Sequence, residues 1–198
     1  SVYEAKKNIE NAREVFSNLS FDLIYAMPNQ TIYEWERTLE TALQFEPDHL
    51  SLYQLTIEKG TVFYQMFRKG TLLPMDNDLA SEMYSVTENL TQKSEIPAYE
   101  VSNYSKKDRN CYHNLNYWEA GDWLGIGPGA VSRFFYNNKR TQLDVRKDPN
   151  GWLNSMKIHS NGIKSVHSET IEEFWREKLL MGLRLVKGVN IKPIKNIL

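Results

Sequence analysis

The stretch NCYHNLNYWEAGDWLGIGPGA, residues 110–130, gathers side chains that could bind a metal or a cofactor. It holds the only cysteine of the chain, one of four histidines, two of five tryptophans and four of ten glycines. The neutral imidazole of His113 is able to ligate haem iron or another metal. The neighbouring Asn114, Tyr117 and Trp118 add polar groups and flat apolar area. Two interpretations remain open: a cofactor-binding cluster, or a capped short helix whose Tyr117 and Trp118 fill core.

The glycine-rich segment Gly125-Ile-Gly127-Pro-Gly129 resembles a phosphate-binding loop only weakly. Pro128 removes a backbone donor, and residues 130–136 are typical of a strand, whereas a dinucleotide fingerprint is followed by a helix. We therefore expect the backbone of this segment to lie in close contact with a partner, with no side chain between the two. The partner is either a bound cofactor or another strand.

Polar side chains also occur inside two predicted strands. Asp22 shares one strand face with Ile24 and Ala26. Because strands of a parallel sheet are buried on both faces, an acid there is expected either to face a ligand or to bond a nearby backbone amide. Gln54 and Thr56 lie near the carboxyl end of the next strand, where α/β folds bind ligands, although water could satisfy both.

Several other kinds of site are excluded or disfavoured by spacing. Cys111 and His113 are too close together for a tetrahedral zinc knuckle, and no second pair follows. The remaining histidines, His49, His159 and His167, are scattered and lack HExxH spacing. No GxSxG motif is present, so a hydrolase is disfavoured.

The elements that must position these residues alternate along the first half of the chain. Apolar spacing and caps predict helices over residues 2–17, 32–45 and 77–93, and near 152–158 and 169–186. Short apolar runs predict strands over residues 20–28, 49–57, 98–103 and 130–136. The helix–strand order up to residue 104 is typical of a parallel sheet with crossover helices. A loop-rich, partly helical region follows.

Composition limits the class of protein. The 198 residues carry a net charge of −1, which disfavours nucleic-acid and polybasic membrane binding, and no apolar run is long enough to span a bilayer. A single cysteine and the lack of a secretory leader indicate a reducing compartment, which we take to be the cytoplasm. The chain begins with serine and ends without a polar tail, so we expect a fragment of a longer protein.

Four segments resemble, in order and spacing, the oxygen-independent coproporphyrinogen III oxidase family of radical S-adenosylmethionine proteins. They are FDLIYAMPNQT (21–31), DHLSLYQLTIEKGT (48–61), HNLNYW (113–118) and GDWLGIGPGAVS (121–132), with KLLMGLRLVKGV (178–189) also fitting. HNxxYW is associated with haem binding in the haem chaperone branch, which this chain resembles most.

The resemblance implies an α/β fold made of the later βα units of a partial (β/α) TIM-like barrel, followed by a partly helical C-terminal module. We assign residues 1–104 to the barrel and 105–198 to a truncated module. The [4Fe–4S] cluster of the family needs several thiolates, which lie upstream in Cys-x3-Cys-x2-Cys. Cys111 cannot replace them, so the missing N-terminal half of the barrel is an implied partner.

Position by position, the resemblance assigns S-adenosylmethionine contacts to Asp22, Thr56 and Val131. It assigns haem contacts to His113, Asn114, Tyr117 and Trp118, with His113 as a ligand of the haem iron. Asp22 and the Gly125–Gly129 bend are then expected to face one cavity.

Three positions depart from the family pattern. Ala26 and Asn29 stand where the family usually has glycine, and Val131 stands where the chaperone branch commonly has histidine. These departures fit a divergent member, or a split or decaying gene.

The resemblance implies three alternative functions. The first is a haem chaperone that passes haem to acceptor proteins. The second is oxidative decarboxylation of a porphyrinogen, started by a 5′-deoxyadenosyl radical. The third is a non-catalytic remnant. Whether the intact protein is an enzyme stays open, but this chain alone is expected to be inactive because it lacks the cluster cysteines.

Overall fold

The computed structural model describes residues 1–191, which fall into two compact units. Unit 1 begins at Ser1 and ends at Asn110, and unit 2 begins at Cys111. The predicted assignment of residues 1–104 to a barrel and 105–198 to a module stays a prediction about the intact protein. The last seven residues of that module, 192–198, lie outside the described residues.

Unit 1 alternates helices and strands, as the apolar spacing predicts. Its elements are α1 (Val2–Val15), β1 (Ser20–Tyr25), α2 (Ile32–Leu43), β2 (His49–Gln54), α3 (Val62–Arg68), α4 (Asn77–Lys93), β3 (Ala98–Glu100) and β4 (Asn103–Ser105). Capping boxes at Ser1 and Thr31 begin α1 and α2, and the Asp76 carboxylate caps α4. No helix was expected over α3, which Thr61 caps with its side chain.

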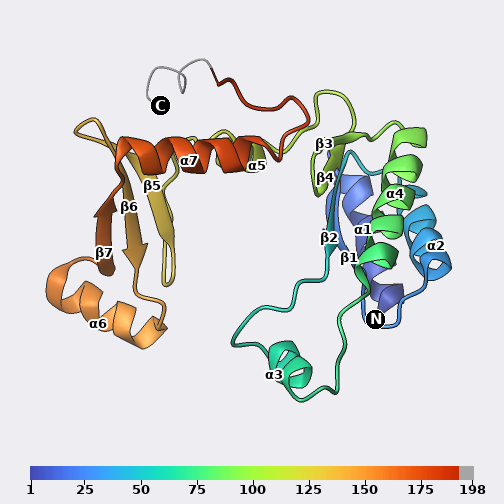
Figure 1. The fold of residues 1–198 in the computed structure, drawn as a ribbon, viewed down its shortest axis with the longest axis horizontal. Coiled ribbons are helices and arrows are strands. Elements are labelled where there is room, and N and C mark those ends of the chain that lie inside the picture. Colours follow the sequence, from blue (N-terminus) through green and yellow to red (C-terminus); the bar gives the residue numbers. More distant parts are fainter. Residues whose placement is uncertain (192–198) are drawn as a thin grey trace. The chain divides into compact units, whose positions relative to one another are not determined.

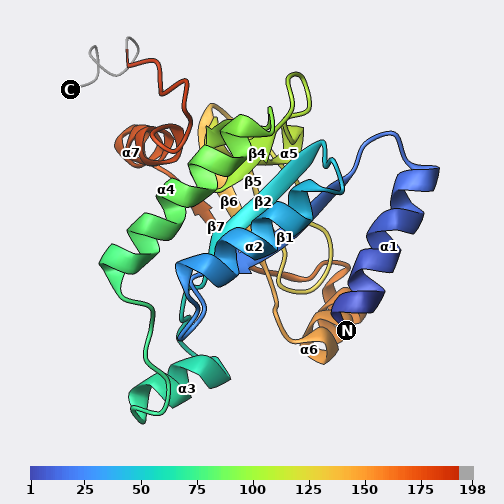
Figure 2. The ribbon, with the colours of Figure 1, turned by 90° about the vertical axis from the view of Figure 1, so that its right-hand side faces the viewer.

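Helices α2 and α4 cover one face of the four-stranded sheet of unit 1 (Figures 1 and 2). Between them and the sheet lies the apolar core, formed by Tyr25, Ala26, Trp35, Leu39, Leu50, Leu52, Met83, Ile96 and Tyr104. The Tyr25 and Trp35 rings stack with centroids 4.7 Å apart, and Trp35 Nε1 donates to Thr87 Oγ1 at 2.8 Å. The covered face therefore supplies the stability of this unit.

The sheet is mixed, with the order β1-β2-β4-β3. Strands β1 and β2 are parallel, but β2–β4 and β4–β3 are antiparallel. The prediction of one parallel strand over residues 98–103 was therefore wrong. That segment turns at Val101 and Ser102, because Glu100 Oε1 accepts from both the backbone N–H and the hydroxyl of Ser102 at 2.9 Å. A local side-chain bond of this kind competes with strand extension.

The other face of this sheet carries polar side chains, and we call it the polar face. Strand alternation places on it Ser20, Asp22, Ile24, His49, Ser51, Tyr53, Asn103 and Ser105. Ile24 is 55% exposed and Tyr53 is 41% exposed. Within unit 1, the same strands thus present an apolar side to the helices and a polar side away from them.

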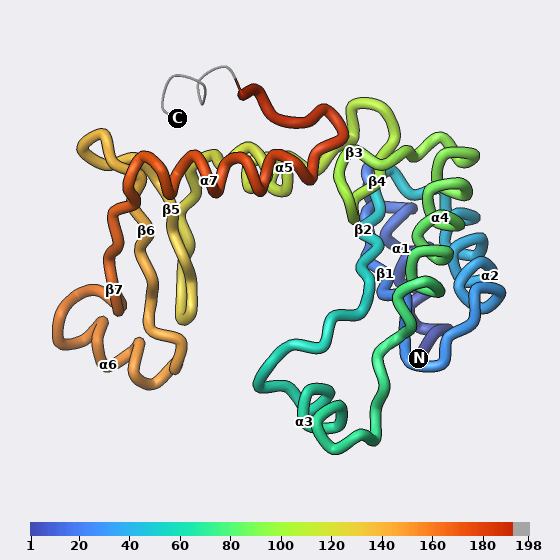
Figure 3. The backbone as a smooth tube through the Cα atoms, viewed as in Figure 1, coloured from blue at the N-terminus to red at the C-terminus, as the bar shows by residue number. Residues whose placement is uncertain are grey.

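Unit 2 contains a three-stranded antiparallel sheet in the order β5-β6-β7 (Figure 3). Its elements are α5 (Tyr112–Trp118), β5 (Val131–Tyr136), β6 (Lys139–Val145), α6 (Pro149–His159), β7 (Ile163–Ser168) and α7 (Ile171–Gly182). The strand predicted at β5 and the helices predicted at α6 and α7 are present, with shifted ends.

Strands β6 and β7 were not predicted. The hairpin between β5 and β6 turns at Asn137 and Asn138, whose φ values of 49° and 60° match a type I′ turn. The Asn-Asn pair was interpreted only as the end of a strand. It also signals a return strand, because asparagine tolerates the left-handed conformation that this turn requires.

Candidate functional site

Asp22 lies on the polar face of unit 1, in the middle of β1 and opposite Ser51 of β2. Its side chain is exposed, so the expectation of a strand buried on both faces was wrong for this residue. The physical reason is that the helices of unit 1 cover only the other face of the sheet. Within residues 1–191 its carboxylate makes no hydrogen bond and no ion pair, which favours the ligand-facing interpretation over the backbone-bonded one.

His49 is a titratable neighbour of Asp22 on this face and was missed from the sequence. Its Nδ1 lies 2.8 Å from Ser20 Oγ and its Nε2 lies 2.9 Å from Tyr99 Oη. Burial lowers the pKa of the imidazole below its usual 6.5, although the negative charges of Asp22 and Glu100 oppose this. The alternation of His49 and Ser51 with leucines was the signal that places this histidine on the strand face opposite the leucines.

Thr56 follows β2 rather than belonging to it, because the strand ends at Gln54. The prediction that Gln54 and Thr56 share a strand face was therefore wrong. The Thr56 side chain is exposed and its hydroxyl donates to the Gln54 carbonyl at 3.5 Å. The Gln54 amide donates to the Ala80 carbonyl of α4 at 3.4 Å. Gln54 thus contacts the covering helix, and only Thr56 is left for a ligand.

Two residues after β1 that were noted as departures from the resembled family have positive φ angles. Ala26 has φ 56° and Asn29 has φ 62°. The left-handed region costs an alanine roughly 1 kcal/mol relative to glycine, and it costs asparagine less. The backbone therefore adopts a conformation that favours glycine at both positions, although neither residue is glycine.

The glycine loop of unit 2 closes on its own chain. A Cβ added at Gly125 would lie 2.5 Å from the Val131 carbonyl oxygen, and the Gly125 N–H donates to Ser132 Oγ at 3.0 Å. Of the two partners expected for this segment, the neighbouring strand is the one found at Gly125. Gly127, at φ 96°, has open space at its Cβ position. Val131 begins β5 with 38% of its surface exposed.

The His113 imidazole lies on α5 and is exposed. Its ring meets the Tyr117 ring edge to face, with centroids 4.6 Å apart, and Tyr117 meets Trp123 in the same way at 4.5 Å. The alternative in which His113 and Asn114 cap a helix was wrong: both lie inside α5, whose N-cap is Cys111 without a side-chain bond. One helical turn thus pairs an accessible imidazole with an aromatic ring.

Trp118 is directed elsewhere. The Arg184 guanidinium lies 4.3 Å from the centre of its ring, and its buried indole Nε1 has no hydrogen-bond partner among the described residues. The four residues assigned to haem therefore have three different environments. His113 and Tyr117 form an accessible pair, Asn114 is half-buried, and Trp118 packs against the segment after α7.

Large apolar side chains are exposed close in sequence to the His113–Tyr117 pair. Tyr112 is 83% exposed, Leu124 is 76% exposed and Ile126 is 96% exposed. A contiguous patch of such side chains would mark a binding surface, whereas single exposed apolar residues are ordinary. These three side chains give unit 2 apolar area that suits the face or the edge of a large ring.

The residues present do not fit an iron–sulfur cluster. Within residues 1–191, no three histidine, cysteine or carboxylate side chains come close enough together to hold a metal ion. The single thiol, Cys111, is half-buried at the start of α5. Across the same residues, no helix has both the length and the apolar character needed to cross a bilayer.

Comparison with known proteins gives consistent relatives, although no family model matches the chain. The chain is 34% identical over 194 residues to the mouse protein named "Radical S-adenosyl methionine domain-containing protein 1, mitochondrial", covering 96% of the chain and 44% of the relative. It is 33% identical over 187 residues to the "Heme chaperone HemW" of Bacillus subtilis, covering 93% of the chain and 48% of the relative. The chain thus spans less than half the length of these relatives.

Among solved structures, coproporphyrinogen III oxidase (HemN) of Escherichia coli, described as a radical SAM enzyme, matches with a TM-score of 0.72 at 18% identity. The match covers 96% of the chain and 45% of that structure. It confirms the predicted α/β fold as that of the corresponding part of a radical S-adenosylmethionine protein. The sequence relatives show that the chain is related to part of radical S-adenosylmethionine domain proteins and HemW-type proteins, and the HemN structure shows that it shares the fold of the corresponding part of a radical SAM protein.

Proposed function

We propose that this chain is part of a haem chaperone, and that unit 2 contacts haem through His113. The observation that carries the proposal is the accessible imidazole of α5, set against the Tyr117 ring and continued by Trp123. The HemW relatives, which are named as haem chaperones, support the same class of ligand.

The donor set around His113 suits haem. A neutral imidazole nitrogen is a common axial ligand of haem iron, and bound haem would supply an iron atom that accepts its lone pair. Tyr117 holds the imidazole from one side and limits its rotation. The exposed Tyr112, Leu124 and Ile126 offer apolar contacts to the ring edge. In this role Asn114 is a polar neighbour, and Trp118 anchors α5 through Arg184 rather than touching haem.

For S-adenosylmethionine, we propose contacts from Asp22, Thr56 and Val131 in the intact protein. The Asp22 carboxylate is exposed and makes no ion pair within residues 1–191, so it is suited to a ligand amine or hydroxyl. Thr56 and Val131 are also exposed. The cluster ligands, and with them any radical chemistry, must come from the upstream half, because this chain has one cysteine. Haem-acceptor proteins are the partners that a chaperone requires.

We also propose a reducing compartment such as the cytoplasm. The half-buried thiol of Cys111 has no partner cysteine in the chain, which suits such a compartment. The name of the mouse relative places that protein in mitochondria, so the compartment is open to a direct test by localisation of the tagged protein.

A haemin titration followed by the Soret band tests the haem site. We expect the chain to shift and sharpen the band, and we expect His113→Ala to lose at least tenfold in affinity because the axial ligand is gone. His159→Ala is the matched control, since this histidine is also exposed and lies in α6 of the same unit. Identical spectra for the chain and for His113→Ala would refute the assignment.

A second variant separates ligation from packing. Tyr117→Ala keeps the imidazole but removes the ring beside it, so we expect weaker haem binding with the ligated spectrum retained. A fully lost ligated spectrum in Tyr117→Ala, with His113→Ala unaffected, would make the tyrosine the ligand instead.

A further inference from the structure

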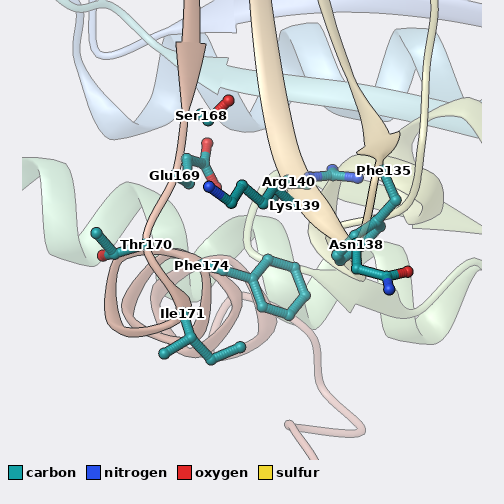
Figure 4. A pocket seen from close by; sticks show the side chains of 9 residues that line it. All are labelled: Phe135, Asn138, Lys139, Arg140, Ser168, Glu169, Thr170, Ile171 and Phe174. Atoms are coloured by element: carbon teal, nitrogen blue, oxygen red, sulfur yellow. The ribbon is translucent and has the colours of Figure 1, made fainter.

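A cavity of about 410 Å³ lies in unit 2 between the β5–β6 turn and the start of α7 (Figure 4). The two aromatic walls are Phe135 of β5 and Phe174 of α7, whose ring centroids are 5.3 Å apart at an interplanar angle of 77°. This volume is within the range of small-molecule sites. The cavity shares no lining residue with the His113–Tyr117 pair.

Glu169 is the chemically unusual residue of this cavity. Its side chain is 6% exposed, and its Oε1 lies 3.6 Å from Arg133 Nη1. Its Oε2 is buried and has no hydrogen-bond partner among the described residues. Burying a carboxylate oxygen without a donor is costly, so a donor from outside the chain would stabilise this arrangement.

The charges around Glu169 favour a cationic donor. Arg133 is paired with both Glu169 and Glu177, so two carboxylates share one guanidinium. The three side chains together carry one negative charge in excess. An ammonium group that donates to Glu169 Oε2 would both satisfy the buried oxygen and balance this charge.

A purely cationic ligand is disfavoured by the two cationic side chains in the lining of the cavity. Lys139 lines it with an exposed side chain that makes no ion pair within residues 1–191. Arg140 also lines it, 2% exposed, with its guanidinium held by Asp122 and by the Gly121 carbonyl. A simple anion is disfavoured in turn by the buried Glu169 carboxylate. A ligand that carries both charges meets neither objection.

We propose that this cavity binds an amphipathic zwitterion of the free α-amino acid class, with a large apolar side chain. Its ammonium group donates to Glu169 Oε2, its carboxylate faces the Lys139 amino group, and its side chain packs against Phe135 and Phe174. Among the described residues Glu169 Oε2 has no hydrogen-bond partner, and Lys139 is exposed. Phe135 is 50% exposed, whereas Phe174 behind it is 9% exposed. The site is separate from the proposed haem contacts and adds a second ligand class.

The probe is 4-fluoro-L-phenylalanine, followed by ¹⁹F line broadening as the full chain is added. From its size we expect a Kd on the order of 0.1–1 mM. Two analogues that each lack one charge serve as comparisons. The N-acetyl derivative lacks the ammonium and 4-fluorophenethylamine lacks the carboxylate, and we expect each to bind at least about tenfold more weakly. These comparisons need no variant, so they hold even if a substitution disturbs folding.

Substitutions then assign the contacts. Glu169→Gln should weaken the amino acid and the amine about tenfold but leave the N-acetyl derivative unchanged, because only the first two have an ammonium. Lys139→Gln should weaken the amino acid and spare the amine. Glu177→Gln is the matched control: it also pairs with Arg133 but does not line the cavity, so it should weaken binding clearly less than Glu169→Gln does.

Equal binding of the three probes would overturn the proposal, as would no broadening by 4-fluoro-L-phenylalanine up to about 10 mM. Unchanged binding in Glu169→Gln would also overturn it. The haemin titration is independent of all these results, because it reports on His113.

Discussion

The two units of this chain keep their interiors together by different chemistry. Unit 1 is built on an apolar core in which Trp35, Leu39 and Leu50 are fully buried. In unit 2 the central buried side chain is a charged one, Arg140 at 2% exposure, with its guanidinium 5.5 Å from the Trp123 ring centre and 5.4 Å from that of Phe135. Among described residues, the buried apolar residues of unit 2 are few: Ala120, Phe174 and Leu185.

The two kinds of interior suit the two units to different roles. Apolar burial is strong and non-directional, so unit 1 forms a firm support from which the polar face of its sheet can present Asp22 and His49. Arginine over aromatic rings is directional and keeps polar groups inside, so unit 2 retains unpaired groups such as Glu169 Oε2 next to cavities. The four predictions below test this contrast, from the largest effect to the smallest.

The largest effect should come from the apolar core. Leu39→Ala in α2 removes a fully buried side chain, so we expect the free energy of unfolding to fall by about 2–5 kcal/mol. Urea unfolding followed by Trp35 fluorescence reports on it, since Trp35 is the one tryptophan of unit 1 and the others can be changed to phenylalanine. Leu73→Ala, at 71% exposure, is the control and should change little. Equal effects at both positions would deny that the core of unit 1 is packed.

In unit 2 the comparable substitution is Arg140→Met. It removes the charge that bonds Asp122 and the Gly121 carbonyl, and we expect a loss of about 2 kcal/mol. The loss should stay below that of an unpaired buried charge, because the Asp122 side chain is 54% exposed and water can solvate it. Urea unfolding followed by Trp123 fluorescence measures it. Adding Asp122→Asn should cost little more, and a fully additive second loss would contradict the pairing.

The polar face of unit 1 should make stability depend on pH. Burial holds the pKa of His49 below 6.5, so the unfolded chain takes up this proton first as the pH falls. The His49 contribution to stability is therefore complete above 6.5 and is lost as the pH drops from 6.5 toward the lowered pKa. In the native chain, the urea concentration at the unfolding midpoint should fall as the pH is lowered through this window.

Two variants sharpen this test. His49→Gln should flatten the pH dependence of the urea midpoint in that window. Asp22→Asn should steepen it, because the negative charge that supports the imidazolium is gone. A pH profile identical in all three chains would place the titrating group elsewhere.

The smallest effect concerns the backbone at the end of β1. Ala26 has φ 56° and a buried methyl group, so Ala26→Gly should change the free energy of unfolding by less than about 0.5 kcal/mol, because relief of strain offsets the lost contact and the added entropy of the unfolded chain. Ala42→Gly inside α2 also removes a buried methyl group but relieves no strain, so it should cost at least about 1 kcal/mol. Thermal unfolding of the two variants measures the difference. Equal losses of stability in both would show that Ala26 is not strained.

Local signals predicted much of the fold. Helices α1, α2 and α4 begin where Ser1, Thr31 and Asp76 cap them, and such caps act within one helical turn. The hairpin of β3 and β4 was missed because it depends on a side-chain bond between Glu100 and Ser102, which no apolar pattern reveals. Strand β6 was missed although the Asn137-Asn138 turn signals it locally, whereas β7 was missed because it pairs with β6 across the intervening α6.

The candidate site was also predicted only in part. The residue types of Asp22 and His113, together with four ordered segments, were enough to predict the family. The neighbours of these residues were not predictable: His49 comes beside Asp22 through parallel register, and Tyr117 comes beneath His113 through helical spacing and ring orientation. Sequence identifies groups that could react, whereas contacts between strands decide which groups meet.

By itself, the sequence determined the helix starts, the α/β class and the family resemblance, because each depends on local chemistry or on ordered motifs. Only the tertiary structure decided that one face of the unit 1 sheet is apolar and covered while the other carries Asp22 and His49. It alone buried Arg140 among aromatic rings and left an oxygen of Glu169 without a donor. The reason is physical: burial and pairing are properties of residues brought together by folding, and residue type alone does not determine them.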